Sequence, residues 1–302
     1  MGALFDGYVA VDWSASSKPK TGEDSIWIAI RGWGEITEPE NPATRMAAVA
    51  RIEALLRRAT EAGRRLLCGF DFPFGYPKGT ARMLTGADGW ESVWARIAEL
   101  IEDYPDNANN RFEAAAALNA AVAVDGPFWG NGLKRDVPGL PRTKPSGWGE
   151  SLPPNLRHAE RAVRRLPQSG SPQEVWKLSG VGSVGGQALL GIAALEGLRR
   201  RAGAAVWPFQ TLGEGRAHVL AEMYPSLIEP EPGSDVKDAR QVRTWAAALR
   251  RVDSEGDLAR HLSAAGKMPV AVREEEAAIL GMDDPAAFQR MVDVPPARAS
   301  RC

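Results

Sequence analysis

The sequence contains little cysteine and little histidine, and these absences exclude several classes of protein. Its 302 residues include two cysteines, Cys68 within an apolar run and Cys302 at the end, too few for a disulfide framework. The three histidines are scattered, and no cysteine or histidine pair has the spacing of a zinc site. We therefore expect a protein of a reducing compartment and predict a cytoplasmic location.

Long apolar runs and a strong net charge are also missing. No run approaches the roughly 18 apolar residues that a membrane helix requires, and the first residues do not have the pattern of a signal peptide. We predict no membrane partner. The formal net charge is −1, so any contact with nucleic acid would need a local basic patch. The sequence does not indicate an oligomeric state.

The patterns that are present predict one α/β domain. Apolar runs at 8–11, 25–30, 66–70, 205–208 and 219–224 are typical of strands, and the first two read as a hairpin. Helical periods cover 44–62, 90–104, 110–122, 180–200 and 238–252, and two shorter helices follow. We expect a sheet flanked by helices.

A long irregular insertion at about 125–175 interrupts this pattern. It is rich in proline and glycine, and its basic residues are interleaved with Trp129 and Trp148. Such a mixture suits contacts with nucleic-acid backbone and bases, and it suits a solvated loop equally well. The basic residues are Lys134, Arg135, Arg142, Lys144, Arg157, Arg161, Arg164 and Arg165. Arg135 and Lys144 are our candidate substrate contacts in this segment.

Acidic residues stand at the ends of predicted strands. Asp12 and Asp71 each end an apolar run, Glu222 lies in a later strand, and Asp235 and Asp238 flank the start of a helix. Residues at the carboxyl ends of parallel strands converge on one crevice. Carboxylates gathered there suit Mg²⁺ or Mn²⁺, and two such ions about 4 Å apart form the site of many nucleases. Each acid alone could also be a turn former or a helix cap.

The motifs around these acids resemble a known family. They are Val9-Ala10-Val11-Asp12-Trp13-Ser14, Gly69-Phe70-Asp71-Phe72-Pro73-Phe74-Gly75, Glu222-Met223-Tyr224-Pro225-Ser226 and Lys237-Asp238-Ala239. They are similar to those of a widespread prokaryotic family of predicted nucleases with a ribonuclease H-like fold. The resemblance covers most of the chain outside the insertion and the C-terminal tail.

The resemblance implies a fold and a set of ligands. The fold would be a mixed five-stranded sheet flanked by helices, with the first strand central and a hairpin beside it. The metal-binding acids would be Asp12, Asp71, Glu222 and Asp238. Asp235 and Asp238, three residues apart, also resemble the paired acids on the last helix of Holliday junction resolvases.

A glycine-rich turn at 180–185 matches the G-x-G-x-x-G pattern and precedes a helix. A dinucleotide site is disfavoured, because residues 174–179 make a poor strand and no acid lies about 20 residues further on. An anion site at the helix N-terminus and close packing of small residues both remain open. Ser14, Gly182 and Ser183 are our candidate phosphate contacts.

The resulting hypothesis is a Mg²⁺- or Mn²⁺-dependent hydrolase of phosphodiesters, a nuclease with nucleic acid as its partner. Asp12, Asp71, Glu222 and Asp238 would be both catalytic residues and metal ligands. One alternative is an ATP-binding or phosphotransfer protein of the actin-like or sugar kinase type, with Asp12 and the glycine-rich turn holding phosphates. Another is a non-catalytic binding protein on the same fold.

Overall fold

The computed structural model describes residues 2–33, 35–36, 38–122, 125–146, 148, 151–166, 170–210, 212 and 217–293. Cys302 and the tail that begins at residue 294 lie outside this part of the chain. Cys68, in contrast, is a free thiol buried in the core.

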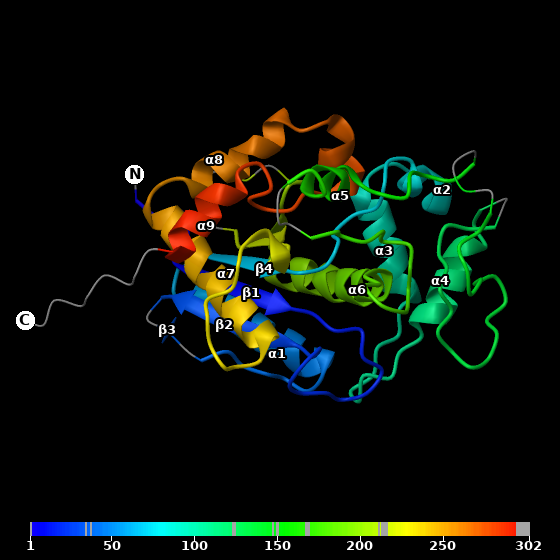
Figure 1. The fold of residues 1–302 in the computed structure, drawn as a ribbon, viewed down its shortest axis with the longest axis horizontal. Coiled ribbons are helices and arrows are strands. Elements are labelled where there is room, and N and C mark those ends of the chain that lie inside the picture. The colour runs from blue at the N-terminus through cyan, green and yellow to red at the C-terminus, as the bar shows by residue number, and fades with distance from the viewer. Residues whose placement is uncertain are drawn as a thin grey trace, which may run out of the picture.

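A mixed sheet forms the centre of the molecule (Figure 1). Its strands lie in the order β3 (Glu35–Ile36), β2 (Trp27–Gly32), β1 (Gly7–Asp12), β4 (Leu66–Phe70), β6 (Val219–Glu222) and β5 (Ala205–Val206). β2 is antiparallel to β1 and β3, whereas β1, β4, β6 and β5 run parallel. The predicted α/β class, with a first hairpin and an interior first strand, is confirmed.

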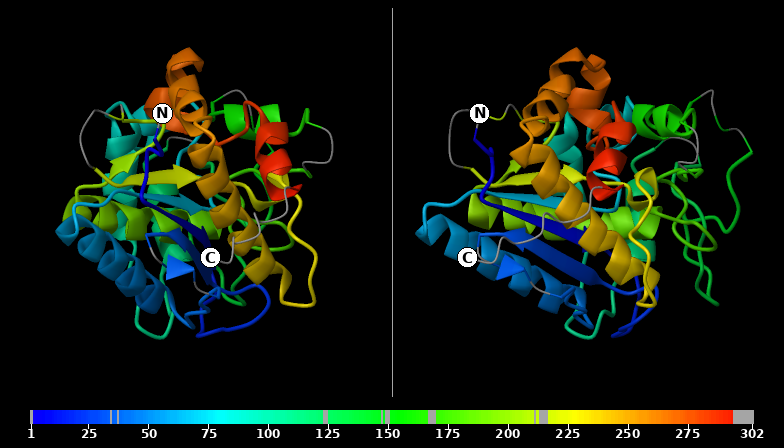
Figure 2. Two further views of the ribbon diagram at one scale, coloured as in Figure 1. Left: turned by 90° about the vertical axis from the view of Figure 1, so that its left-hand side faces the viewer. Right: turned by 60° about the vertical axis from the view of Figure 1, so that its left-hand side comes forward.

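Helices cover both faces of the sheet (Figure 2). Because side chains alternate along a strand, Val9 and Val11 point to one face and Tyr8 and Ala10 to the other. The first face packs on α1 (Arg45–Glu61), α3 (Trp90–Leu100) and α6 (Gly185–Ala202). The second packs on α7 (Lys237–Ser254), α8 (Leu258–Ser263) and α9 (Pro285–Asp293).

The helix boundaries follow local signals in the sequence. The Thr44 side chain accepts the Ala47 N–H and caps α1, and Gly63, with φ of 64°, follows its end. α3 ends at Leu100, before the predicted residue 104, and α4 occupies only Arg111–Asn119. A short helix, α2 (Thr80–Thr85), lies before α3. Residues 174–179 form no strand, as expected.

The insertion is irregular apart from α5 (His158–Val163), and its positions 147, 149–150 and 167–169 lie outside the described residues. Aromatic residues fix it to the core. Trp176 is fully buried and lies 5.2 Å, between ring centroids, from both Tyr76 and Phe128. The Asn119 amide bonds the backbone of Phe128 and Gly139.

One polar segment is more buried than its sequence suggests. Glu274, Glu275 and Glu276 read most simply as a solvated helix face, and this interpretation is wrong for the last two. Glu276 is 3% exposed and accepts the backbone N–H groups of Lys78 and His158. Glu275 accepts those of Gly79 and Ala81, at the start of α2. Both acids satisfy N–H groups at helix starts.

Among the described residues, no helix is both long enough and apolar enough to cross a membrane.

Candidate functional site

Asp12 and Asp71 form the centre of the candidate site. They lie at the ends of neighbouring parallel strands: Asp12 ends β1, and Asp71 comes directly after β4. Each carboxyl acts on the pKa of the other. The Trp13 N–H donates to Asp71 Oδ1 at 2.7 Å, and the Asp71 N–H donates to the Val11 carbonyl at 3.2 Å. The sheet therefore brings this predicted pair together.

Both carboxyls of the pair have a raised pKa. Burial and the adjacent Asp71 charge raise the pKa of Asp12 well above its usual value. Burial raises the pKa of Asp71 to about 7, and the interactions with Asp12 and the Trp13 N–H oppose this shift. Both acids therefore bind protons more tightly than an exposed aspartate does.

Asp238 adds a third negative charge near this pair. It lies in the first turn of α7, and its carboxylate accepts the Asp24 N–H at 2.8 Å. Its charge raises the pKa of both Asp12 and Asp71. Asp235 does not join it, because Arg243 binds its carboxylate at 3.0 Å. Of the two acids at the start of α7, only Asp238 acts on the pair.

Glu222 lines a cavity together with Asp12 and Asp71, but its carboxylate is bonded to other groups. It is 3% exposed at the end of β6. Both its oxygens accept hydrogen bonds from the Arg157 guanidinium, at 2.6 and 2.7 Å, and one also accepts the Phe74 N–H. Arg157, itself fully buried, binds Glu160 as well. Burial raises the pKa of Glu222, although Arg157 opposes this shift.

The expected group of four carboxylates is therefore not assembled within the described residues. No three histidine, cysteine, aspartate or glutamate side chains there are placed to hold one metal ion. Asp12 and Asp71 act on each other's pKa, Asp238 acts on both through its charge, and Arg157 binds Glu222. A pair with an additional acid nearby replaces the predicted cluster.

A cavity of about 470 Å³ opens onto the pair. Its wall includes Asp12, Asp71 and Glu222, together with Gly182 from the glycine-rich turn. The side chain of Gln187, in the first turn of α6, donates to the Trp13 carbonyl at 2.6 Å, which ties the helix start to the end of β1. The acid pair and the helix N-terminus thus face one space.

The glycine-rich turn is also tightly packed. A Cβ atom at Gly185 would lie 2.4 Å from the Val175 carbonyl oxygen, and one at Gly186 would lie 3.1 Å from that of Leu178. Gly180 and Gly182 have φ of 94° and 72°, which other residues rarely adopt. Close packing therefore explains Gly185 and Gly186, whereas Gly182 also reaches the cavity.

The remaining candidate substrate contacts lie away from the cavity wall. Ser14 is buried, and its hydroxyl bonds the Ser16 N–H and the Asp24 carbonyl. The Ser183 N–H donates to the Gly180 carbonyl within the turn. Arg135 pairs with Glu113, and Lys144 pairs with Glu174 at 2.6 Å. Of the five candidates, only Gly182 borders the cavity.

Acidic side chains and backbone carbonyls bind several basic side chains of the insertion. Arg142 pairs with Asp136, Arg164 binds the Pro172 carbonyl, and Lys144 also lies over the Trp148 ring at 4.7 Å. These contacts match the solvated-loop interpretation of the basic pattern better than a free basic surface.

Sequence reasoning missed several residues of the cavity. Arg157 was placed among the basic residues of the insertion, and Asp24 and Gln241 were not singled out, yet all three line the cavity. Asp24 stands in a polar turn, and its φ of 51° aims its backbone N–H at Asp238. No local pattern distinguishes Arg157 from its neighbours, because its partner Glu222 is 65 residues away.

Comparison of the chain with protein-family models, with curated proteins and with solved structures finds no match. Function is therefore inferred from the residues of the site.

Proposed function

We propose that this protein is a Mg²⁺- or Mn²⁺-dependent phosphodiester hydrolase, a nuclease, whose cation is held by Asp12 and Asp71. The observation that carries the proposal is the pair of half-buried aspartates at the ends of adjacent parallel strands, which line one cavity and both have a raised pKa. A divalent cation can replace the protons that they bind and neutralise both groups.

The donor set suits these cations. Mg²⁺ is commonly bound through one or two carboxylates, with waters and substrate phosphate completing its shell. Asp12 and Asp71 supply hard oxygen ligands, and Asp238 adds negative charge beside them. Two or three carboxylates fit one cation better than the two-ion site expected from the sequence, because Glu222 is bound to Arg157.

The strand order adds support. The first strand lies inside the sheet with a hairpin beside it, as the resemblance to ribonuclease H-like nucleases implies, although the described sheet has six strands instead of the implied five. Asp12 and Asp71, two of the four acids that the resemblance implies, end neighbouring strands. We therefore extend the proposal to this fold family.

Each part of the cavity has a role in the proposed reaction. When bound, the cation would polarise a phosphoryl oxygen and lower the pKa of a water molecule. The carboxylate oxygens of Asp12 and Asp71 would hold the cation, and the Trp13 N–H fixes the carboxylate of Asp71. Gly182 and the start of α6 form the wall where a phosphate would lie, since a helix N-terminus favours anions. Arg157 and Glu222 neutralise each other and shape the opposite wall.

The test is cleavage of a panel of single-stranded, duplex and branched DNA and RNA with Mg²⁺, Mn²⁺ or EDTA. We expect cleavage that depends on the cation and falls at least about 100-fold in Asp12→Asn and Asp71→Asn, as for loss of an essential charged group. Asp88→Asn is a matched control, because Asp88 is exposed and pairs only with Arg82 in the described structure. Cleavage retained by both site variants contradicts the proposal.

The ATP-binding alternative has a separate test. It draws on the position of Gly182, which places the glycine-rich turn and Asp12 on one cavity. Actin-like and sugar kinase proteins, however, duplicate the fold, and the described residues form one sheet. Tight ATP binding by calorimetry, with no cleavage of nucleic acid, would favour that alternative over the nuclease.

A further inference from the structure

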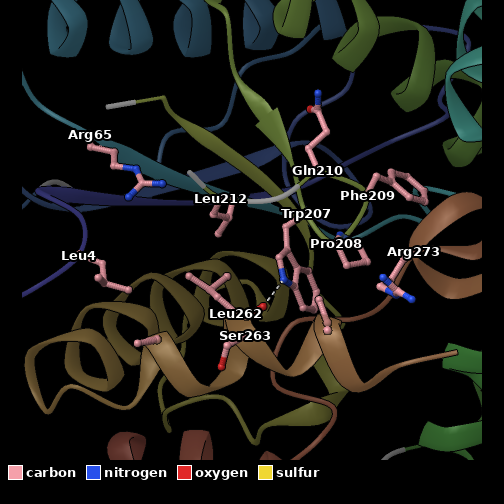
Figure 3. A pocket seen from close by; sticks show the side chains of 13 residues that line it. Leu4, Arg65, Trp207, Pro208, Phe209, Gln210, Leu212, Leu262, Ser263 and Arg273 are labelled. Atoms are coloured by element: carbon pink, nitrogen blue, oxygen red, sulfur yellow. Dashed lines mark hydrogen bonds between the residues drawn. The ribbon is translucent and has the colours of Figure 1, made fainter. Parts of the chain in front are cut away.

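A second cavity, of about 580 Å³, lies at the other edge of the sheet. It is enclosed by the segment that follows β5 and by α8 with the turn after it (Figure 3). It shares no lining residue with the cavity of the acid pair. Its size falls within the range of about 300–1,000 Å³ that small-molecule sites occupy.

The wall of this cavity is apolar and firmly held. The Trp207 indole N–H donates to the Leu262 carbonyl at 2.9 Å, so the ring presents only carbon to the cavity. Phe209 stacks on Trp90 with ring centroids 4.8 Å apart and planes at 3°. Leu4 and Leu212 complete the apolar lining. Such a surface suits the flat or aliphatic body of a ligand.

Two arginines face each other across this apolar wall. Figure 3 shows Arg65 and Arg273 on opposite sides of Trp207. The Arg273 Nε atom is buried and has no hydrogen-bond partner in the described structure. The Arg65 Nε donates to the Ala217 carbonyl, and the guanidinium carbon of Arg65 lies 4.5 Å from the centroid of the Phe5 ring. Burial lowers its pKa. Burying the Arg273 donor without an acceptor is costly, and an anion would supply that acceptor.

Arg273 is held in place by its own segment. It belongs to a five-residue π-helix, Val272–Glu276, a rare element that occurs frequently at functional sites. Two acids of the same element, Glu275 and Glu276, bind backbone N–H groups of distant segments and fix this turn. The guanidinium therefore reaches the cavity from an anchored backbone.

We propose that this second cavity binds a small organic anion with an apolar body, an aromatic or medium-chain carboxylate, whose acid group pairs with Arg273 and whose body lies on Trp207 and Phe209. Arg65, at the far end, favours ligands that carry a second polar group. The site is independent of the acid pair, so it would regulate the protein or carry a ligand rather than take part in hydrolysis.

The test uses two fluorescent probes of similar shape on the full chain. 8-Anilinonaphthalene-1-sulfonate is an anion, and N-phenyl-1-naphthylamine is its uncharged counterpart. We expect one anionic probe to bind per chain and the neutral probe to bind at least about tenfold more weakly, as for one lost charge-assisted hydrogen bond. Decanoate should displace the anionic probe, and decanol should not.

Variants locate the binding. Arg273→Gln should weaken the anionic probe about tenfold and leave the neutral probe unchanged, and Arg273→Lys should restore part of the loss. Arg290→Gln, on α9 and outside this cavity, is the matched control. Asp71→Asn should bind the probe normally, which separates this site from the proposed nuclease.

Equal binding of both probes, or displacement by decanol as readily as by decanoate, would overturn the proposal. These two measurements use the unaltered chain, so they decide it even if a variant does not fold.

Discussion

Asp71 shows how burial and a like-charged neighbour act on one carboxyl. Its ordinary pKa is near 4, and the folded protein raises it to about 7. Between these values the folded chain holds a proton that the unfolded chain releases. The free energy of unfolding therefore falls as the pH rises from about 4 to about 7. Keeping the two acids together in the folded protein therefore lowers its free energy of unfolding above about pH 4.

The first prediction concerns the replacement of Asp71 by asparagine. Asp71→Asn keeps the acceptor for the Trp13 N–H but removes the charge. We expect the variant to be about 2 kcal/mol more stable than the wild type at pH 8, with the difference shrinking towards pH 4. Urea unfolding at several pH values measures this. A difference independent of pH would show that folding does not raise the pKa of Asp71.

A second residue-scale prediction concerns Arg157. It neutralises Glu222 and Glu160 in a buried network, so Arg157→Met leaves two carboxylates without their partner. We expect a loss of about 3 kcal/mol in unfolding free energy. Adding Glu222→Gln should restore part of it, because one uncompensated charge disappears. Additive effects in this double-mutant cycle would contradict the coupling.

Residue patterns predicted part of this site and could not predict the rest. Asp12 and Asp71 end apolar strands, and adjacent parallel strands necessarily bring such ends together. Glu222 also lies at a strand end, but which side chain binds it depends on Arg157, which comes from the irregular insertion. An ion pair between segments 65 residues apart leaves no local periodicity to detect.

At the scale of elements, α7 separates two acids that look equivalent in the sequence. Asp238 accepts the Asp24 N–H and acts on the acid pair, whereas Asp235 binds Arg243. We expect Asp238→Asn to reduce cation-dependent cleavage about tenfold and Asp235→Asn to leave it unchanged. Steady-state cleavage rates of both variants check this. Equal losses would mean that the two acids act as a pair.

The glycine-rich turn supplies a prediction on packing. Gly185 begins α6, and an added Cβ atom would lie 2.4 Å from the Val175 carbonyl oxygen. We expect Gly185→Ala to lower the unfolding free energy by about 1–3 kcal/mol through this overlap. Gly266→Ala, where no atom lies within 4 Å, is the control for thermal unfolding. Unchanged stability of Gly185→Ala would show that the turn can open.

Elements were predictable where local signals are strong. The Thr44 cap and Gly63 mark the two ends of α1, and two continuous apolar runs mark the strands of the β1–β2 hairpin. The insertion was less predictable, because its order comes from tertiary contacts such as those of Trp176 with Tyr76 and Phe128. Glu275 and Glu276 look like a solvated face until helix starts elsewhere in the chain supply their N–H partners.

At the scale of the whole molecule, two of the cavities lined by the described residues differ in character. The parallel strands deliver acids to one of them, and the segment after β5 encloses the other together with α8. Their linings differ in charge, since carboxylates dominate the first and arginines the second. The account therefore assigns a cation and a phosphodiester to one cavity and an organic anion to the other.

Calorimetry of Mn²⁺ binding near pH 6, in two buffers with different ionisation enthalpies, tests the assignment of the metal site most directly. We expect the wild type to bind the cation and to release protons, because the raised pKa values of Asp12 and Asp71 keep both carboxyls largely protonated at this pH. Asp12→Asn and Asp71→Asn should lose this binding. Undiminished binding in both variants, or binding without proton release, would contradict the assignment of the acid pair as the metal site.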